Sequence, residues 1–355
     1  MSDETIMLEI DGSHGEGGGQ ILRTALSLSC LLGTPFRIVN IRKKRALPRG
    51  RAGLMPQHLT AVRALKEMCE ARVVGDNDGS MDLTFEPGRV RAGEYRFNVG
   101  TAGSTSLLLQ AILPALLMEN SPSSITLIGG THVIYSPTFH YISEVFLPAL
   151  SALGLHARAS IERYGFYPRG GGKVILEVTP SSVVRPLNSY SCNISNIRGI
   201  SGVGNLPLTI AERQKDAALH ILREEGYAAE IDSVSVPAFG PGTFIFLAAQ
   251  TDLLRAGFSA LGERGKRAEI VGAEAARALI GHLKTGACLD EHLADQIVIY
   301  LAMAQGESSF TTSRISLHLL TNLWVIERFL DIRYRIDGTP GSPGAVTISS
   351  RARVL

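Results

Sequence analysis

A threefold repeat is the feature that most constrains how this 355-residue chain can fold. Each copy continues from a loop into an apolar helix, a strand, a second helix and short strands. Because such helices and strands must bury their apolar faces against one another, each copy predicts a sheet covered by two helices. The predicted helix pairs lie at 21–32 and 57–70, at 105–117 and 138–153, and at 293–304 and 318–330.

Residues 186–285 interrupt the repeat between its second and third copies. They predict strands at 194–201, 230–236 and 243–250, a helix at 209–225, and loop or helix at 256–264 and 273–285. Insertions are usually tolerated at surface loops, where few contacts are lost. The sequence therefore predicts an α/β (α+β) fold, with a core of three units at 1–185 and 286–355 and a small inserted α/β domain at 186–285.

The composition is that of a folded, non-membrane protein, with 45% hydrophobic and 19% charged residues. The apolar run at 106–118 is shorter than the roughly 20 residues that span a bilayer, and the polar start predicts no secretory signal. Cys30, Cys69, Cys192 and Cys288 are scattered singly, which argues against disulfides or a thiolate zinc site. We expect a soluble, cytoplasmic protein with reduced cysteines and no membrane partner.

A glycine-rich stretch, Asp11 to Arg23, opens the first predicted helix. Backbone amides at a helix start favour an anion, so a phosphate site is one interpretation. The spacing matches neither the dinucleotide-binding turn nor the P-loop, and a simple tight turn is the alternative. The polar members of the stretch, Glu16, Gln20 and Arg23, favour a site.

A basic segment follows the first predicted strand, with seven basic residues and no acid between Arg37 and Arg51. A net charge of only +2 means that a polyanion must be held by such a local patch rather than by the overall field. The segment is either a solvated loop or a phosphate-binding surface. Gln57 and His58 begin the next helix, where they can serve either the helix start or the same surface.

The nine histidines include no spacing typical of a zinc site. Glu16 lies without an acidic neighbour in sequence, so its expected metal would be a hard cation shared with substrate phosphates. The third copy carries polar clusters at 290–296 and 316–322. His318, in the second cluster, lies in no serine or cysteine motif; it is either a hydrogen-bonded structural residue or itself a nucleophile.

Taken together, these segments resemble the RNA 3'-terminal phosphate cyclases over essentially the whole chain. The resemblance is carried by motifs in family order: Gly15-Glu16-Gly17-Gly18-Gly19-Gln20-Ile21-Leu22-Arg23, Gln57-His58-Leu59-Thr60, Gly100-x-Ala102-Gly103-Ser104, Gly129-Gly130-Thr131, Gly165-Phe166-Tyr167-Pro168-x-Gly170-Gly171-Gly172, Leu293-Ala294-Asp295-Gln296 and His318-Leu319-Leu320-Thr321-Asn322. It implies three units of a four-stranded sheet with two helices, and a thioredoxin-like inserted domain.

The activity that this resemblance implies is ATP-dependent conversion of an RNA 3'-phosphate to a 2',3'-cyclic phosphate. The implied route passes through AMP bound to His318, then through an RNA-(3')pp(5')A intermediate. The implied partners are ATP and RNA with a 3'-phosphate end, while the oligomeric state stays open. An imidazole can take and return adenylate because a P–N bond becomes labile when its nitrogen is protonated.

The resemblance also implies roles for the remaining site residues. Glu16 would hold Mg²⁺ or Mn²⁺ on the ATP phosphates, and three arginines would neutralise the triphosphate. His292 replaces a tyrosine found in many family members, so contact with the adenine there is expected to differ. The implied ATP and AMP contacts are Gln20, Arg23, Arg42, Arg45, Gln57, His58, His292, Asp295 and Gln296.

Two other interpretations stay open at this point. Cyclase-like scaffold proteins of ribosomal RNA maturation share the fold but lack the nucleophile and its pocket. Enolpyruvyl-transferase-like enzymes are built on similar repeats, without these motifs. The retention of Glu16, Arg23 and His318 favours the catalytic interpretation.

Overall fold

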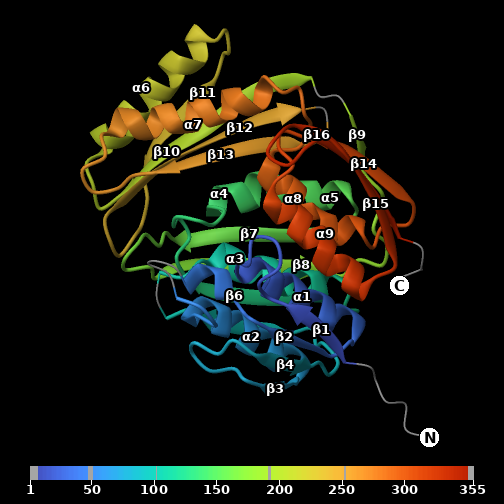
Figure 1. The fold of residues 1–355 in the computed structure, drawn as a ribbon. Coiled ribbons are helices and arrows are strands. Elements are labelled where there is room, and N and C mark those ends of the chain that lie inside the picture. Colours follow the sequence, from blue (N-terminus) through green and yellow to red (C-terminus); the bar gives the residue numbers. More distant parts are fainter. Residues whose placement is uncertain (1–6, 47–50, 101, 191–192, 252, 351–355) are drawn as a thin grey trace, which may run out of the picture.

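The computed structural model describes residues 7–46, 51–100, 102–190, 193–251 and 253–350 (Figure 1). Its first module contains two long helices and a four-stranded sheet in the order β1-β2-β4-β3, in which β1 is parallel to β2 and the other pairs are antiparallel. The elements are β1 (Leu8–Asp11), α1 (Gly19–Leu32), β2 (Phe36–Val39), η1 (Lys43–Ala46), α2 (Pro56–Cys69), β3 (Arg72–Val74) and β4 (Leu83–Glu86).

The second module repeats this pairing, with the sheet order β5-β6-β8-β7. The helix predicted at 138–153 is broken by a π-helical turn, and Pro148 stands in the first turn of the helix that follows, where a missing N–H is tolerated. The elements are β5 (Glu94–Asn98), α3 (Thr105–Leu117), β6 (Ser123–Gly129), α4 (Phe139–Tyr141), η2 (Ile142–Phe146), α5 (Leu147–Ala152), β7 (His156–Arg163) and β8 (Gly172–Thr179).

The third module has the same strand pairing, with the order β9-β14-β16-β15. Its first strand is separated from the rest by more than 100 residues of chain, because the inserted unit lies between β9 and α8. The elements are β9 (Asn188–Ser189), α8 (Glu291–Leu301), β14 (Glu307–Thr312), α9 (Leu317–Phe329), β15 (Ile332–Asp337) and β16 (Gly344–Ser350).

The inserted unit forms a sheet of its own in the order β11-β10-β12-β13. The segment predicted as loop or helix at 256–264 is instead largely a strand, because Arg255–Leu261 pairs antiparallel with β12. We propose that this unit is the inserted domain predicted at 186–285. Its elements are β10 (Ile194–Gly204), α6 (Leu208–Glu224), β11 (Glu230–Ser235), β12 (Gly242–Thr251), β13 (Arg255–Leu261) and α7 (Ala268–Leu283).

The described residues thus form four mixed four-stranded sheets, which confirms the predicted α/β fold class. The predicted copies lacked their first strands, β1, β5 and β9. Each of these strands has five residues or fewer and pairs in parallel with only one neighbour, so it leaves little periodic signal. Within the described ranges no helix is both long and apolar enough to cross a membrane.

The first and third modules are joined through buried helices, and this junction positions the site. Figure 1 shows α1 and α9 next to each other, although they come from opposite ends of the chain. Thr24 on α1 donates a buried hydrogen bond of 2.7 Å to Asn322 Oδ1 on α9. Asn322 Nδ2 donates in turn to the Asp295 carbonyl on α8, at 2.6 Å. Paired buried polar groups of this kind fix one relative placement of the three helices.

The cysteines that the structure describes, Cys30, Cys69 and Cys288, are free and buried. Cys192 lies outside the described residues, as does Arg49 of the predicted basic segment.

Candidate active site

A cavity of about 930 Å³ opens at the junction of the first and third modules. The loop 135–138 of the second module and the elements β13 and α7 of the inserted unit complete its wall. Every residue predicted to hold adenylate, triphosphate or metal lines this cavity. These residues are Glu16, Gln20, Arg23, Arg42, Arg45, Gln57, His58, His292, Asp295, Gln296 and His318.

The glycine-rich loop follows the surface of α9 in a regular register. Three successive loop residues each meet a side chain of α9, and those side chains are three positions apart, which places them next to one another on the helix surface. Gly15 adopts a left-handed φ of +53°, and a Cβ there would collide with the Thr321 hydroxyl. The contacts are His14 with Trp324, Gly15 with Thr321 and Glu16 with His318.

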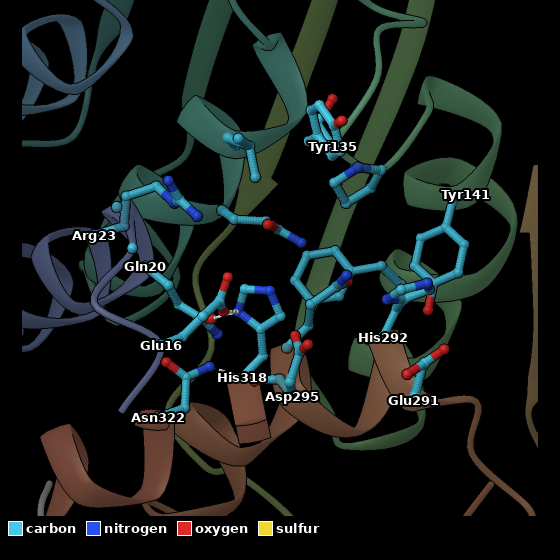
Figure 2. Close-up of a pocket in the computed structure, with 18 of the residues that line it drawn as sticks. Glu16, Gln20, Arg23, Tyr135, Tyr141, Glu291, His292, Asp295, His318 and Asn322 are labelled. Atoms are coloured by element: carbon cyan, nitrogen blue, oxygen red, sulfur yellow. Dashed lines mark hydrogen bonds and ion pairs between the residues drawn. The ribbon is translucent and has the colours of Figure 1, made fainter. Parts of the chain in front are cut away.

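His318 is held by its Nδ1 atom. Glu16 Oε2 lies 2.8 Å from Nδ1, and Gln20 Oε1 also contacts it. Because both partners are acceptors, we assign the proton of the neutral imidazole to Nδ1, which leaves Nε2 with a free lone pair. Figure 2 shows the ring between Glu16 and Gln20 on one side and Asp295 on the other. This is the arrangement of an oriented nucleophile or base.

The pKa of His318 reflects opposing effects. Burial alone would lower it, but the hydrogen bond to Glu16 and the negative charges of Asp295 and Glu16 outweigh burial, so the pKa is raised. The protonated form of His318 is therefore favoured, and the ring must lose this proton before Nε2 can attack.

Glu16 is a carboxylate between His318 and Arg45. His318 is the main cause of its lowered pKa, and Arg45, which also contacts it, adds to the effect. Among the described residues no group of three or more His, Cys, Asp or Glu side chains is arranged to hold a metal ion. The Glu16 carboxylate is an oxygen donor of the kind that a hard cation accepts.

Two ionisable side chains in the cavity with His318, Arg23 and Asp295, have strongly shifted pKa values. Burial lowers the pKa of Arg23 to about 10, which still leaves it charged at neutral pH, and Asp295 and Glu16 favour that charge. Burial raises the pKa of Asp295 to about 7, against the opposing effect of His292 and His318. Titratable groups shifted this far in one cavity are typical of functional sites.

His58 lies beneath the start of α1. Its Nδ1 accepts a hydrogen bond of 3.0 Å from the Met55 backbone, so its Nε2 carries the proton and points at Gly19, where a side chain would not fit. Burial, together with Arg23 and Arg42, lowers its pKa to about 3, so it stays neutral. Because Gly19 has no side chain, it leaves room for the His58 ring.

Two helix starts that line the cavity, those of α1 and α2 in the first module, are not closed by side-chain oxygens. The residue before α1 is Gly18, and no side chain caps the first-turn amides. The residue before α2 is Met55, which likewise offers no oxygen. The first-turn amides of α1, with Arg23, Arg42 and Arg45 lining the same cavity, are suited to an extended anion.

The comparisons with known proteins identify the family. The family model described as "RNA 3'-terminal phosphate cyclase" matches residues 14–336. The chain belongs to the RNA 3'-terminal phosphate cyclase family. It is 45% identical over 350 residues to the RNA 3'-terminal phosphate cyclase of Methanopyrus kandleri, covering 96% of this chain and 98% of the relative.

Other cyclases are similarly close. The Methylococcus capsulatus cyclase is 45% identical, with 94% of this chain and 95% of the relative covered. The Pyrococcus abyssi cyclase is 44% identical, with coverages of 97% and 99%. The solved enolpyruvyl transferase NikO from Streptomyces tendae matches with a TM-score of 0.37 and 8% identity, covering 96% of this chain and 48% of that chain, which is too weak to bear on the interpretation. The resemblance seen in the sequence is confirmed at the level of the family.

The sequence did not indicate how the cyclase cavity continues beyond His292. Tyr300 and His282 line this part and are almost fully buried, with 1% and 5% of their surface exposed. Within the described ranges, the Tyr300 hydroxyl, His282 Nδ1, Gln296 Oε1 and Gln110 Nε2 have no hydrogen-bond partner. Buried polar groups normally have partners, so these atoms are available to a ligand. For Gln296 and Tyr300 the sequence carried a weak indication, because residues one turn apart on a helix such as α8 lie on the same face.

His292 is one of the exposed residues among the predicted cyclase contacts, as are Arg45 and Gln57. Its ring meets Tyr141 edge-on, with centroids 6.3 Å apart, and Tyr141 is fixed by a 2.8 Å hydrogen bond to Asp290. Asp290 also caps α8 through the His292 and Leu293 amides. The position expected to contact adenine is therefore on the rim, beside a rigidly held tyrosine.

Proposed function

We propose that the protein converts an RNA 3'-terminal phosphate to a 2',3'-cyclic phosphate at the expense of ATP, through adenylate bound to His318. The observation that carries the proposal is the held imidazole: Glu16 and Gln20 engage Nδ1, and Nε2 is free in a cavity lined by arginines. Membership of the cyclase family supports the overall reaction.

In the first step, His318 Nε2 attacks the α-phosphorus of ATP. A P–N bond forms, the bond to the bridging oxygen breaks, and pyrophosphate leaves with the electron pair. Glu16 keeps the Nδ1 proton in place and stabilises the positive charge that the ring gains. Arg23, Arg42 and Arg45, with the free amides of α1, balance the charge on the departing pyrophosphate.

In the second step, an oxygen of the RNA 3'-phosphate attacks the same phosphorus and the P–N bond returns its electrons to Nε2. The product is RNA-(3')pp(5')A, whose 3'-phosphorus now carries AMP as a leaving group. The neighbouring 2'-hydroxyl then attacks that phosphorus, loses its proton and expels AMP. Adenylation is needed because a phosphate monoester has no good leaving group of its own.

The remaining predicted contacts have roles in this scheme. We infer that Gln57 and His58 bind the triphosphate end, since they begin α2 beside Arg42. We infer that Asp295, Gln296 and the rim residue His292 bind the adenosine end. A divalent ion, when bound, would be held by Glu16 and the phosphates, and would neutralise phosphate charge as Mg²⁺ or Mn²⁺ does in other nucleotide sites.

Two assays on the full-length protein test this function. Incubation with α-labelled ATP and Mn²⁺ should transfer label to the wild-type chain, and His318→Ala should abolish the transfer. His220→Ala is the matched control, because His220 is an exposed histidine on α6, outside the cavity. With ATP, a 3'-phosphorylated oligoribonucleotide should become resistant to phosphatase.

Label that persists in His318→Ala would contradict the nucleophile assignment. A wild-type chain that neither takes label nor cyclises the oligonucleotide would instead be a non-catalytic relative of the cyclases. The two assays therefore separate an error in the residue from an error in the function.

A further inference from the structure

A stack of aromatic and cationic side chains lies just outside the cavity and has no part in the proposed chemistry. The His14 ring is parallel to the Trp324 ring within 9°, with centroids 3.8 Å apart. The Arg328 guanidinium lies over Trp324, 5.1 Å from the ring centroid. His14 and Arg328 are both exposed, so the stack is open to a ligand.

This stack is tied directly to the nucleophile. His14 is two residues before Glu16, and Trp324 is six residues after His318 on α9. At 1.5 Å per residue, the tryptophan is about 9 Å along the helix axis from His318. The contact of Gly15 with Thr321, described above, lies between the contact of His14 with Trp324 and the contact of Glu16 with His318. It therefore connects the stack with the nucleophile.

Cationic side chains connect the stack with the cavity. Lys44 Nζ donates a 3.1 Å hydrogen bond to the Gly15 carbonyl, between His14 and Glu16, and the neighbouring Arg45 lines the cavity itself. Asp11 and Glu327 also act electrostatically on His14, so the stack itself is close to balanced in charge. The positive charge lies along the path from the stack to the cavity.

We propose that His14, Trp324 and Arg328 form a stacking platform for a base of single-stranded RNA close to the 3'-phosphate. The inference rests on the proposed function, since it takes the 3'-phosphate to lie at His318. A strand leaving His318 along this path would bring its next phosphate to Lys44 and a base to the open face of His14. Stacking on aromatic rings beside cationic groups is how proteins hold single strands without reading sequence.

Trp324 is the only tryptophan of the chain, so its fluorescence reports on this platform alone. The test titrates the full chain, without ATP, with 3'-phosphorylated oligoribonucleotides that carry one abasic site at each of the last four nucleotides in turn. The intact strand should change the emission of Trp324. One abasic position within the last three nucleotides should weaken Kd by roughly 5- to 150-fold, and the others by less than about twofold.

A flat abasic profile, with every position within about twofold of the intact strand, would overturn the proposal. Cyclisation of the same strands with ATP is measured in parallel. If the wild-type chain cyclises the strands but the abasic profile is flat, the platform proposal is wrong and the proposed function stands. If the wild-type chain does not cyclise the strands, the proposed function itself is contradicted.

Variants then assign the effect to the ring. His14→Ala should remove the difference between the intact and abasic strands, whereas His14→Tyr, which keeps a flat ring, should retain it. His220→Ala, an exposed histidine far along the chain, should keep the wild-type difference. A merely structural role for His14 would weaken both strands equally, and that outcome would contradict the platform.

Discussion

The starts of the helices differ between the first module and the other two, although the strand pairing is the same. In the second and third modules, side-chain oxygens cap four helices: Ser104 before α3, Thr138 before α4, Asp290 before α8 and Ser316 before α9. In the first module, Gly18 and Met55 leave α1 and α2 without such a cap.

The difference shows how one architecture serves both support and chemistry. A capping oxygen satisfies the amides of its own helix, and it occupies the place where an anion would bind. The first turns of α1 and α2, the two helices of the first module that lack such a cap, line the cavity, with Arg42 and Arg45 nearby. The third module contributes His318 from a capped helix, because a nucleophile must be held still.

The largest effect is expected from Arg23, which turns the open start of α1 into a strong anion site. Arg23→Ala should lower kcat/KM for self-adenylylation by about 100- to 1,000-fold, as removal of one preorganised donor does elsewhere. The check is the initial rate of label transfer from ATP. Arg63→Ala is the control, since Arg63 is exposed on α2 and does not line the cavity. Equal losses in both variants would contradict a local role.

The pH dependence tests how Glu16 of the first module and Asp295 of the third module tune the pKa of His318. Protonated His318 cannot attack, so kcat/KM for adenylylation should rise with pH and level off above the raised pKa of His318. Glu16→Gln removes the main effect that raises this pKa, so the midpoint should move to lower pH even as the rate falls. Asp295, whose pKa is raised to about 7, is a second titrating group beside His318.

Asp295→Asn therefore belongs in the same experiment. It also removes a negative charge near His318, so its midpoint should move in the same direction as that of Glu16→Gln. A midpoint that stays in place in both variants would mean that the observed titration is not that of His318.

A smaller effect is expected at the contact between the loop and α9. Gly15→Ala should destabilise the fold by about 1–2 kcal/mol through its left-handed backbone, and should slow adenylylation because the new methyl group collides with Thr321 beside Glu16. Gly33→Ala has a similar φ, +64°, with open space around it. Both should shift chemical denaturation, and only the first should reduce label transfer; similar losses of label would contradict the register.

The smallest effect comes from exchanging the caps themselves. Gly18→Ser fits the extended backbone of this residue and would offer α1 the kind of cap that Ser104 gives α3. Unfolding free energy should rise by a few tenths of a kcal/mol, while KM for ATP rises several-fold as the cap competes with phosphate. Ser104→Gly should lose a few tenths of a kcal/mol with KM unchanged. An unchanged KM in Gly18→Ser would mean that the α1 amides do not contact ATP.

Much of this arrangement could be predicted from the sequence because the repeat is long and periodic. The pairs of helices and most of the longer strands were predicted close to their observed positions, and the motifs gathered residues from both ends of the chain into one cavity. The short first strands β1, β5 and β9 were missed, since their pairing is set by the tertiary fold. Residues 256–264 were misjudged because β13 forms against β12, which local patterns do not report.

The finer properties of the site depend on contacts between elements. The raised pKa of His318 follows from the approach of Glu16 and Asp295. Both are separated from His318 in sequence: Glu16 lies in the loop before α1, and Asp295 lies on α8. The buried atoms of Tyr300 and His282 without partners likewise depend on the closure of the cavity by α7 and α8. Local sequence patterns do not report the distances between side chains that come from different elements.

The central claim is that nucleotidyl transfer occurs at one atom, Nε2 of His318. This residue lies on the capped helix α9 and lines the same cavity as the open start of α1. The most direct measurement isolates the labelled peptide after reaction with ATP and identifies the residue by mass spectrometry and the ring nitrogen by phosphorus–proton NMR coupling. The account predicts AMP on Nε2 of His318. AMP on the nearby Lys44, or on Nδ1 of His318, would contradict it.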